Sequence, residues 1–479
     1  MSALPLLLAS ALGATDGGST WSGFRNGANA PLRAEHLPLS WRAVGGVAWR
    51  VRLTGYGQSA PAVFGGRVFV TSVPGTKRQK AVVVCLGASD GRRVWQTELV
   101  ASVQGDLHDM VSRAAPTPIV DRDGLYVMFE SGDMARLSIS DGKVLWKRAL
   151  FREYGSYENG HGYGSSPAHN RHSIFVQVDH QGPSYLVAIE KRSGRTLWKT
   201  ERPSRMSWTS PVVARQGGRD VVIVSSTGDV RGYDAASGQE LWKFDGLSGN
   251  HIPSPTVDGD RLYLGAATPR GGRTTSGART PAQSNCALNL IMRDGKPGVE
   301  LLWEGRRALC EYGSPTAHRG LVYSVNPAGV AFCVDAETGE ERWSERIGGP
   351  CWVSPIAVGD RIYFFTKRGA TTVVKSGPRF EKLASSSLWS EGEGPLPEVD
   401  YTPPVRSGGA NGASGRPTAA AGNAEDRGAA DGPRGGAASY GPLDPCVYGV
   451  AVVDGAFFVR IGTDLFCVRT AGARQTSGR

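Results

Sequence analysis

The stretch Tyr312–Trp343, YGSPTAHRGLVYSVNPAGVAFCVDAETGEERW, has the pattern of four short β-strands joined by tight turns. Ser314-Pro315 opens a short inner strand, and the apolar runs LVYSV and VAFCVD, separated by a Pro-Ala-Gly turn, follow as two further strands. A Thr-Gly corner then leads into a last strand that carries Trp343. Such a sheet cannot bury both of its faces alone, so the pattern indicates one unit of a repeat.

Both ends of this unit recur along the chain. The starts place Pro after a small residue, at Ser59-Ala-Pro61, Ala115-Pro116, Ser166-Pro167, Ser210-Pro211, Ser254-Pro255, Ser314-Pro315 and Ser354-Pro355. The ends are Gly-x-x-x-Trp, or a longer form of it, at Trp95, Trp146, Trp198, Trp242, Trp303 and Trp343. This register predicts an all-β fold of repeated four-stranded blades, in which these tryptophans are structural.

The two ends of the repeat region supply one incomplete blade each. VAWRVRL (47–53), with Trp49, resembles a last blade strand but precedes the first start, whereas residues 446–469 supply three strands without a fourth. We therefore expect the N-terminal strand to complete the last sheet and to close a ring of eight blades without an open edge. The predicted blades are 56–99, 111–150, 161–202, 206–246, 251–307, 311–347, 351–389, and 446–469 together with 47–53.

Other segments lie outside this repeat. SALPLLLASALGA (2–14) is apolar, too short to span a bilayer and ends in small residues, which is typical of a signal peptide. We therefore predict an exported protein, periplasmic or extracellular, that is not transmembrane. The predicted organisation is a signal peptide at 1–14, an extension at 15–46, a propeller at 47–469 and a tail at 470–479. An insert rich in Gly, Ala, Ser and Pro, at 391–445, is predicted to be disordered.

The net charge of +10 comes from basic residues that are scattered along the chain. No nucleic-acid recognition motif accompanies them, so the sequence predicts a basic surface without nucleic-acid binding. We expect a monomer.

The blade sequences resemble those of the pyrroloquinoline-quinone-like propellers. This eight-bladed group includes quinoprotein dehydrogenases and a lipoprotein of the outer-membrane barrel-assembly machinery. WSGFRNG, LPLSW, VAWRV and the run from GSSP at 164 to RMSWTSPVV are similar to exported propellers of bacteria such as planctomycetes. The resemblance covers about 47–469 apart from the inserts and implies the fold, but a propeller scaffold does not by itself imply an activity.

The cofactor site of the quinoprotein dehydrogenases is not matched in this sequence. Those enzymes hold pyrroloquinoline quinone with an adjacent pair of cysteines, a tryptophan platform and a calcium ion. No adjacent cysteines and no C-x-x-C-H haem motif occur here. We therefore expect no cofactor, no metal and no catalytic residues, with the quinone and calcium required only under an alternative dehydrogenase hypothesis.

Three cysteines, Cys310, Cys351 and Cys446, lie just before the inner strands of consecutive blades. In an oxidising compartment Cys310 and Cys351 could form a disulfide; a three-thiol metal site and inert thiols are the alternatives. The total of seven cysteines leaves at least one unpaired within the chain.

The segments that precede the inner strands also carry aromatic and histidine side chains. In a propeller these segments surround one mouth of the central channel. The residues are Tyr56, His108, His161, Tyr163, Trp208, His251, Tyr312, Trp352 and Tyr448. They either pack between neighbouring blades or line a cavity that could stack a planar ligand or a sugar ring, or dock a peptide.

The sequence therefore favours a non-enzymatic, exported propeller that acts as a binding or assembly scaffold in the cell envelope. Its partner is an unknown protein, small molecule or glycan. A quinone-dependent oxidoreductase is the alternative from another class, and carbohydrate binding is a third hypothesis.

Overall fold

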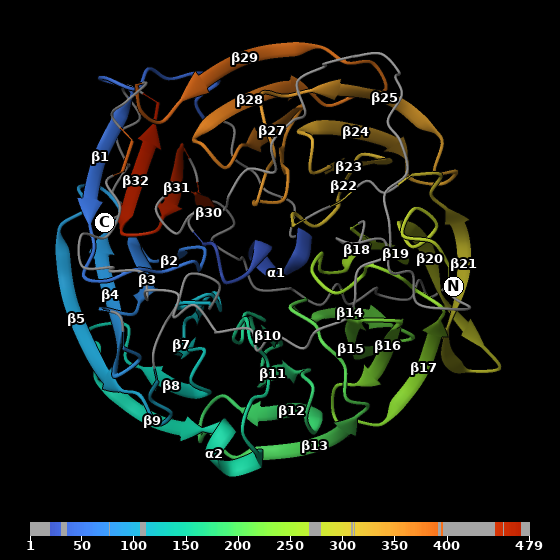
Figure 1. The fold of residues 1–479 in the computed structure, drawn as a ribbon, viewed down its shortest axis with the longest axis horizontal. Helices are drawn as coiled ribbons and strands as arrows, with labels where there is room; N and C mark the ends of the chain where they lie inside the picture. Colours follow the sequence, from blue (N-terminus) through green and yellow to red (C-terminus); the bar gives the residue numbers. More distant parts are fainter. Residues whose placement is uncertain are drawn as a thin grey trace, which may run out of the picture.

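A computed structural model of the protein describes residues 20–29, 36–75, 77–105, 112–267, 279–307, 310, 312–390, 394–395, 446–453 and 455–470. Its strands form eight four-stranded antiparallel sheets, arranged as blades around a central axis (Figure 1). The predicted signal peptide, His108 and nearly all of the insert at 391–445 lie outside the described residues.

The first four blades follow the order of the chain. Blade one contains β2 (Ala62–Phe64), β3 (Arg67–Ser72), β4 (Lys80–Gly87) and β5 (Arg93–Val100). Blade two contains β6 (Ile119–Asp121), β7 (Gly124–Met128), β8 (Asp133–Leu137) and β9 (Val144–Ala149). Blade three contains β10 (Ala168–His169), β11 (Ser173–Val178), β12 (Ser184–Glu190) and β13 (Thr196–Arg202). Blade four contains β14 (Val212–Gln216), β15 (Arg219–Ser226), β16 (Asp229–Asp234) and β17 (Glu240–Asp245).

The remaining four blades complete the ring, and the described residues also include two short helices, one before β1 and one after β9. Blade five contains β18 (Thr256–Asp258), β19 (Arg261–Leu264), β20 (Cys286–Arg293) and β21 (Lys296–Glu304). Blade six contains β22 (Thr316–His318), β23 (Leu321–Val325), β24 (Val330–Asp335) and β25 (Glu341–Arg346). Blade seven contains β26 (Ile356–Val358), β27 (Arg361–Phe365), β28 (Ala370–Lys375) and β29 (Lys382–Ser387). Blade eight contains β30 (Val447–Val453), β31 (Ala456–Ile461), β32 (Asp464–Arg469) and β1 (Val47–Arg52), and the helices are α1 (Arg25–Asn29) and α2 (Leu150–Tyr154).

The N-terminal strand closes the ring as predicted. β1 pairs antiparallel with β32, from Val47 opposite Val468 to Arg52 opposite Asp464. The Arg50 guanidinium also donates to the buried Asp464 carboxylate, at 2.8 Å. Blade eight is therefore built from both ends of the described chain, and closure pairs the last sheet with a strand from the first residues of the propeller.

A nearly complete ring of hydrogen bonds joins the inner strands of blades one to seven at their starts. In each case a backbone N–H donates to the hydroxyl of the equivalent residue in the next blade, at 2.9–3.2 Å. The sequence of donors and acceptors is Ala60 to Thr117, Thr117 to Ser166, Ser166 to Ser210, Ser210 to Ser254, Ser254 to Ser314 and Ser314 to Ser354. The recurring small hydroxyl residue before Pro therefore links blades one to seven.

This ring corrects the predicted start of blade two. The sequence pattern predicts a start at Ala115-Pro116, but Pro118 directly precedes β6 and Thr117 makes both bonds of the ring. The start is therefore Thr117-Pro118. The two Pro residues two positions apart gave the sequence two equivalent frames, and only the hydroxyl distinguishes them.

The blade-end tryptophans lie between neighbouring blades. Each indole N–H donates to a backbone carbonyl of the next blade at 2.9–3.2 Å, from Trp49 to Ala88, Trp95 to Ile139, Trp146 to Lys191, Trp198 to Ala235, Trp303 to Ala336 and Trp343 to Gly377. Trp242 differs, since its indole donates to the Gln216 side chain within its own blade. Blade five, which would have received Trp242, has the longer GKPGVELLW end in place of the usual Gly corner.

Candidate functional site at the channel mouth

Four of the predicted mouth residues form a continuous arc of rings, here called the aromatic arc: Tyr312, Trp352, Tyr448 and Tyr56. Tyr312 and Trp352 are stacked, with ring centroids 4.1 Å apart and planes 11° apart. Trp352 then meets Tyr448 edge to face at 5.7 Å, and Tyr448 meets Tyr56 at 5.9 Å. The two tyrosine hydroxyls are hydrogen-bonded at 2.5 Å. The arc therefore runs across blades six, seven, eight and one.

A lysine lies against the stacked end of this arc. The Lys367 ammonium is 5.0 Å from the ring centroid of Tyr312 and 4.8 Å from that of Trp352, within the range of a cation–π interaction. Lys367 belongs to the turn between β27 and β28. Its N–H donates to Pro350 O and its carbonyl accepts from Val447 N, so blades seven and eight both position it.

A second, shorter group lies at the starts of blades three to five. The Trp208 ring is 5.9 Å from the His161 ring and 6.1 Å from the His251 ring. Its indole N–H donates to Gly162 O, and its backbone N–H donates to His251 O. Burial lowers the pKa of His251, so this imidazole is neutral at pH 7. His161 is exposed, whereas Trp208 and His251 are half-buried.

Tyr163 does not lie in either group. Its ring is 1% exposed and packs edge to face against Phe151 and Tyr157. Its hydroxyl donates to Gln177 O in β11. Of the two alternatives for this residue, packing between blades applies and lining of the mouth does not, because the side chain turns into the packing between blades two and three, where apolar neighbours bury its ring.

Two buried arginines lie next to the tyrosine end of the arc, and sequence reasoning missed both. The Arg113 guanidinium is 5.7 Å from the Tyr56 ring centroid. Arg460 is fully buried and donates to Gly57 O and to Ser72 Oγ, each at 3.3 Å. Burial raises the pKa of Tyr56 to about 12, although both cations favour its phenolate. An arginine inside the apolar strand AFFVRI was the available signal for Arg460.

Asp179 and His180, which directly follow β11, are not paired with each other. The Asp179 carboxylate accepts two bonds from Arg202, at 2.9 and 3.0 Å, and a third from Gln177. The His180 ring instead accepts from the Glu158 N–H. Both are buried parts of a structural network, and the arrangement contains no acid–base dyad.

Of the alternatives for Cys310 and Cys351, the structure has free thiols and no disulfide, and both side chains are buried. Their side chains belong to different surroundings. Cys310 Sγ lies so close to Gly265 that a Cβ atom added to this glycine would be 2.9 Å from the sulfur. Cys351 instead packs in the apolar cluster that contains Leu321 and Phe364. Burial raises the pKa of the Cys310 thiol to about 12, so it is protonated at neutral pH.

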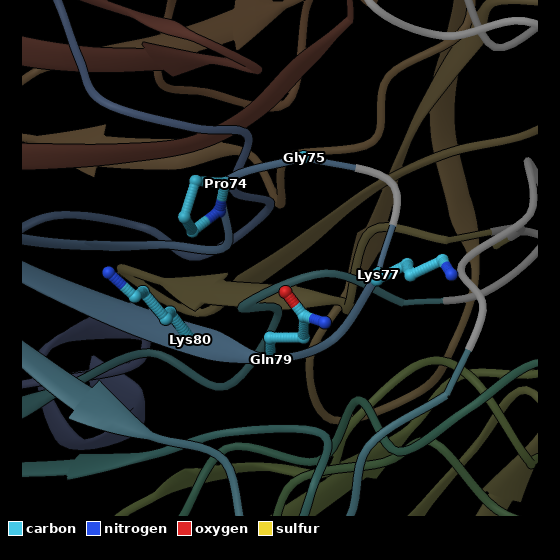
Figure 2. A pocket seen from close by; sticks show the side chains of 5 residues that line it. All are labelled: Pro74, Gly75, Lys77, Gln79 and Lys80. Carbon is cyan, nitrogen blue, oxygen red and sulfur yellow. The ribbon is translucent and has the colours of Figure 1, made fainter.

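A shallow basin of about 320 Å³ lies on the connection between β3 and β4 (Figure 2). It is lined by Pro74, Gly75, Lys77, Gln79 and Lys80. Figure 2 shows the two lysine side chains pointing away from each other. The basin therefore does not direct several polar groups at one ligand, and the aromatic arc is the better candidate site.

The sequence of the propeller matches one protein family over most of its length. The model of a family described as outer membrane protein assembly factor BamB matches residues 39–182, 182–280 and 293–438. The chain belongs to this family. Among solved structures, BamB from Moraxella catarrhalis has a TM-score of 0.51 at 12% identity, covering 89% of this chain and 98% of that chain, a likeness in fold alone.

Curated relatives of this BamB-family chain fall into more than one functional class. BamB of Alkalilimnicola ehrlichii is 29% identical over 228 residues, which are 46% of this chain and 51% of that protein. The quinoprotein ethanol dehydrogenase of Pseudomonas aeruginosa is 32% identical over 133 residues, 26% of this chain and 19% of that enzyme. The chain thus matches about half the length of the first relative and less of the second.

A quinone with calcium would need acidic donors and, in the quinoprotein dehydrogenases, an adjacent pair of cysteines, and the described part of this BamB-family chain can be compared with that requirement. Within the described ranges, no group of three or more His, Cys, Asp or Glu side chains could hold a metal ion. The seven cysteines include no adjacent pair.

Among the residues that the structure describes, no helix is long and apolar enough to cross a bilayer.

Proposed function

We propose that this protein is an exported scaffold of the cell envelope that binds a protein partner at the channel mouth. The observation that carries this proposal is the aromatic arc, in which four rings and the Lys367 ammonium lie side by side at one end of the inner strands. Half-buried aromatic side chains combine a large apolar area with few rotatable bonds, and they dominate the energetics of protein interfaces.

Family membership supports a protein as the partner. BamB relatives are described as factors of outer membrane protein assembly. The corresponding role here is to hold a component or a substrate of such assembly, which supports an exported protein. Carbohydrate recognition has no support among these relatives, and we do not propose it.

Photo-crosslinking in the cells that produce the protein tests this proposal. A photoreactive phenylalanine analogue replaces Trp352 in one variant and Leu145, which is 48% exposed on the outer strand β9, in a matched control. We expect a defined polypeptide adduct from position 352 and none from position 145. The Y312A substitution should abolish the adduct at 352. Equal labelling at both positions would contradict recognition at the mouth.

A quinone-dependent oxidoreductase is the second candidate, because a quinoprotein ethanol dehydrogenase is among the relatives. Its test is reconstitution of the purified protein with pyrroloquinoline quinone and calcium. A new absorbance band together with dye-linked alcohol oxidation would favour the enzyme over the scaffold. We favour the scaffold because the described residues lack the donor cluster and the chain lacks adjacent cysteines.

A further inference from the structure

The segment 20–29 crosses the centre of the ring. Trp21 and Ser22 contact the inner strands of blades one and two, whereas Arg25 contacts blades five and six on the opposite side. Figure 1 shows α1, which begins at Arg25, in the middle of the ring of blades. The axis of the propeller is therefore occupied by a peptide segment of the chain itself.

The first half of this segment adds to the inner sheet edges as an extended peptide. The Trp21 N–H donates to Val63 O at 2.8 Å, and the Val63 N–H donates back to Trp21 O at 2.9 Å. The Val120 N–H then donates to Ser22 O at 2.9 Å. Main-chain bonds to an exposed strand edge are a general mode of peptide recognition. The Trp21 ring is 5% exposed, so its burial adds apolar area to these bonds.

The second half places an arginine into a polar pocket. The Arg25 guanidinium donates to Pro255 O at 3.2 Å, to Thr256 Oγ1 at 2.5 Å and to Pro315 O at 2.8 Å. The acceptors are thus two carbonyls and one hydroxyl, which together take three bonds from a planar, forked cation. Burial lowers the pKa of Arg25 to about 10, which leaves it charged at neutral pH.

The backbone at this point is held in a sparsely populated conformation. Arg25 and Asn26 both have φ of +51°, in the left-handed region, which is uncommon for residues with a Cβ. The Asn26 side chain supports the turn by accepting from the Ser22 N–H at 2.9 Å. Such conformations persist where the surrounding contacts determine them, and here those contacts are the inner strands of the ring.

We propose that the inner surface of the ring is a peptide-binding site which the protein's own segment 20–29 occupies. The ligand class is a peptide that is extended at an aromatic residue and turns at an arginine four positions later, because the anchors are the buried Trp21 ring and the Arg25 guanidinium with its three hydrogen bonds. A competing peptide of this kind binds when the internal segment leaves. This site is distinct from the aromatic arc and does not depend on the function proposed for it.

Fluorescence anisotropy with a labelled peptide of residues 20–29, TWSGFRNGAN, tests the proposal on the full-length protein. In the R25A variant the internal segment loses its anchor and competes less for the site. The dissociation constant of the free peptide should therefore be at least about tenfold lower for R25A than for the wild type. The same peptide with alanine at its arginine should lose that binding. A T256V substitution added to the R25A variant, which removes one acceptor from the pocket, should also weaken it.

In the binding experiment, three results would overturn the proposal: a folded R25A variant that does not bind the peptide, equal binding by wild type and variant, or equal binding of the alanine peptide. Arg25→Lys, which keeps the charge and loses the forked geometry, serves in place of R25A if that variant does not fold. A measurement on the unmodified protein completes the test. The Val63 and Val120 amides, which bond to the segment, should exchange slowly with deuterium. Exchange at the rate of free amides would refute occupancy of the site.

Discussion

The indole of Trp352 lies parallel to the phenol ring of Tyr312, with centroids 4.1 Å apart. Each residue precedes the inner strand of its own blade, so the stack joins blades six and seven at the mouth. Both side chains are half-buried, and Lys367 approaches both rings. Contacts with neighbouring residues of the propeller thus fix the two side chains, while part of each stays accessible to solvent. A recognition surface requires both properties.

Replacement of Trp352 by alanine should remove binding and leave the fold intact. The ring pair contributes on the order of 0.5–1.5 kcal/mol beyond its buried area, a modest cost for the fold. We expect a near-native melting temperature together with loss of the partner crosslink. Trp208→Ala should likewise keep the fold and weaken partner binding. Severe unfolding of both variants would mean that these rings only pack the blades together.

Replacement of Trp198 by alanine should have the opposite result. Its indole donates to Ala235 O in the next blade, at 3.0 Å, and the ring stacks on Phe175 with centroids 6.0 Å apart. Truncation of such a packed Trp costs about 3–5 kcal/mol. Urea denaturation should therefore show a clearly lower midpoint for W198A than for W208A. Equal midpoints would contradict the distinction between blade tryptophans and mouth tryptophans.

Alanine substitutions at two glycines, Gly238 and Gly218, can distinguish the cost of a steric clash from the cost of backbone strain. Gly238 has φ of +75°, and a Cβ there would lie 2.4 Å from the Trp198 ring; Gly218 has φ of +80° and open space around it. Both alanine variants incur the strain of positive φ, about 1 kcal/mol, but only Gly238→Ala also displaces the indole. We expect G238A to lower the free energy of unfolding by about 1–3 kcal/mol more than G218A does. Equal losses would show that the ring contact contributes nothing.

The fold was predictable because two local rules repeat in one register. The small residue before Pro and the Gly-x-x-x-Trp end each form a bond to the neighbouring blade, so the sequence pattern records contacts between blades. The Trp pattern does not predict the bonding partner at Trp242. Its indole donates to Gln216 in its own blade because blade five lacks the usual Gly corner, so the partner depends on the sequences of two blades at once.

The candidate site was predictable only in part. The positions before the inner strands indicated which aromatic side chains gather, but not which of them turn inward, as Tyr163 does. Lys367 and Arg460 reach the arc from a turn and from a second strand, at sequence distances that no local pattern records. The position of Arg25 on the far side of the axis was equally impossible to predict from the sequence. Its hydrogen-bond acceptors belong to blades five and six, whereas Arg25 itself lies in a segment that precedes the first blade.

The thiols provide the last prediction. Burial raises the pKa of Cys310 to about 12 and also raises that of Cys351, so both stay protonated at pH 8 and should react slowly with iodoacetamide in the native protein. An unfolded thiol titrates near pH 8.5. Above that pH the unfolded chain releases protons that the folded chain retains, so these thiols should lower the stability as the pH rises toward 12.

Mass spectrometry after alkylation at a series of pH values measures the rate at each cysteine. For native Cys310 and Cys351 the rate should keep rising up to pH 10, whereas in concentrated urea it should level off once the pH exceeds the ordinary thiol pKa of about 8.5. In urea all seven cysteines should be alkylated without a reducing agent. A Cys310–Cys351 peptide link in protein made in an oxidising compartment would contradict the free thiols of the structure, because the two side chains would then have to leave their separate packing sites.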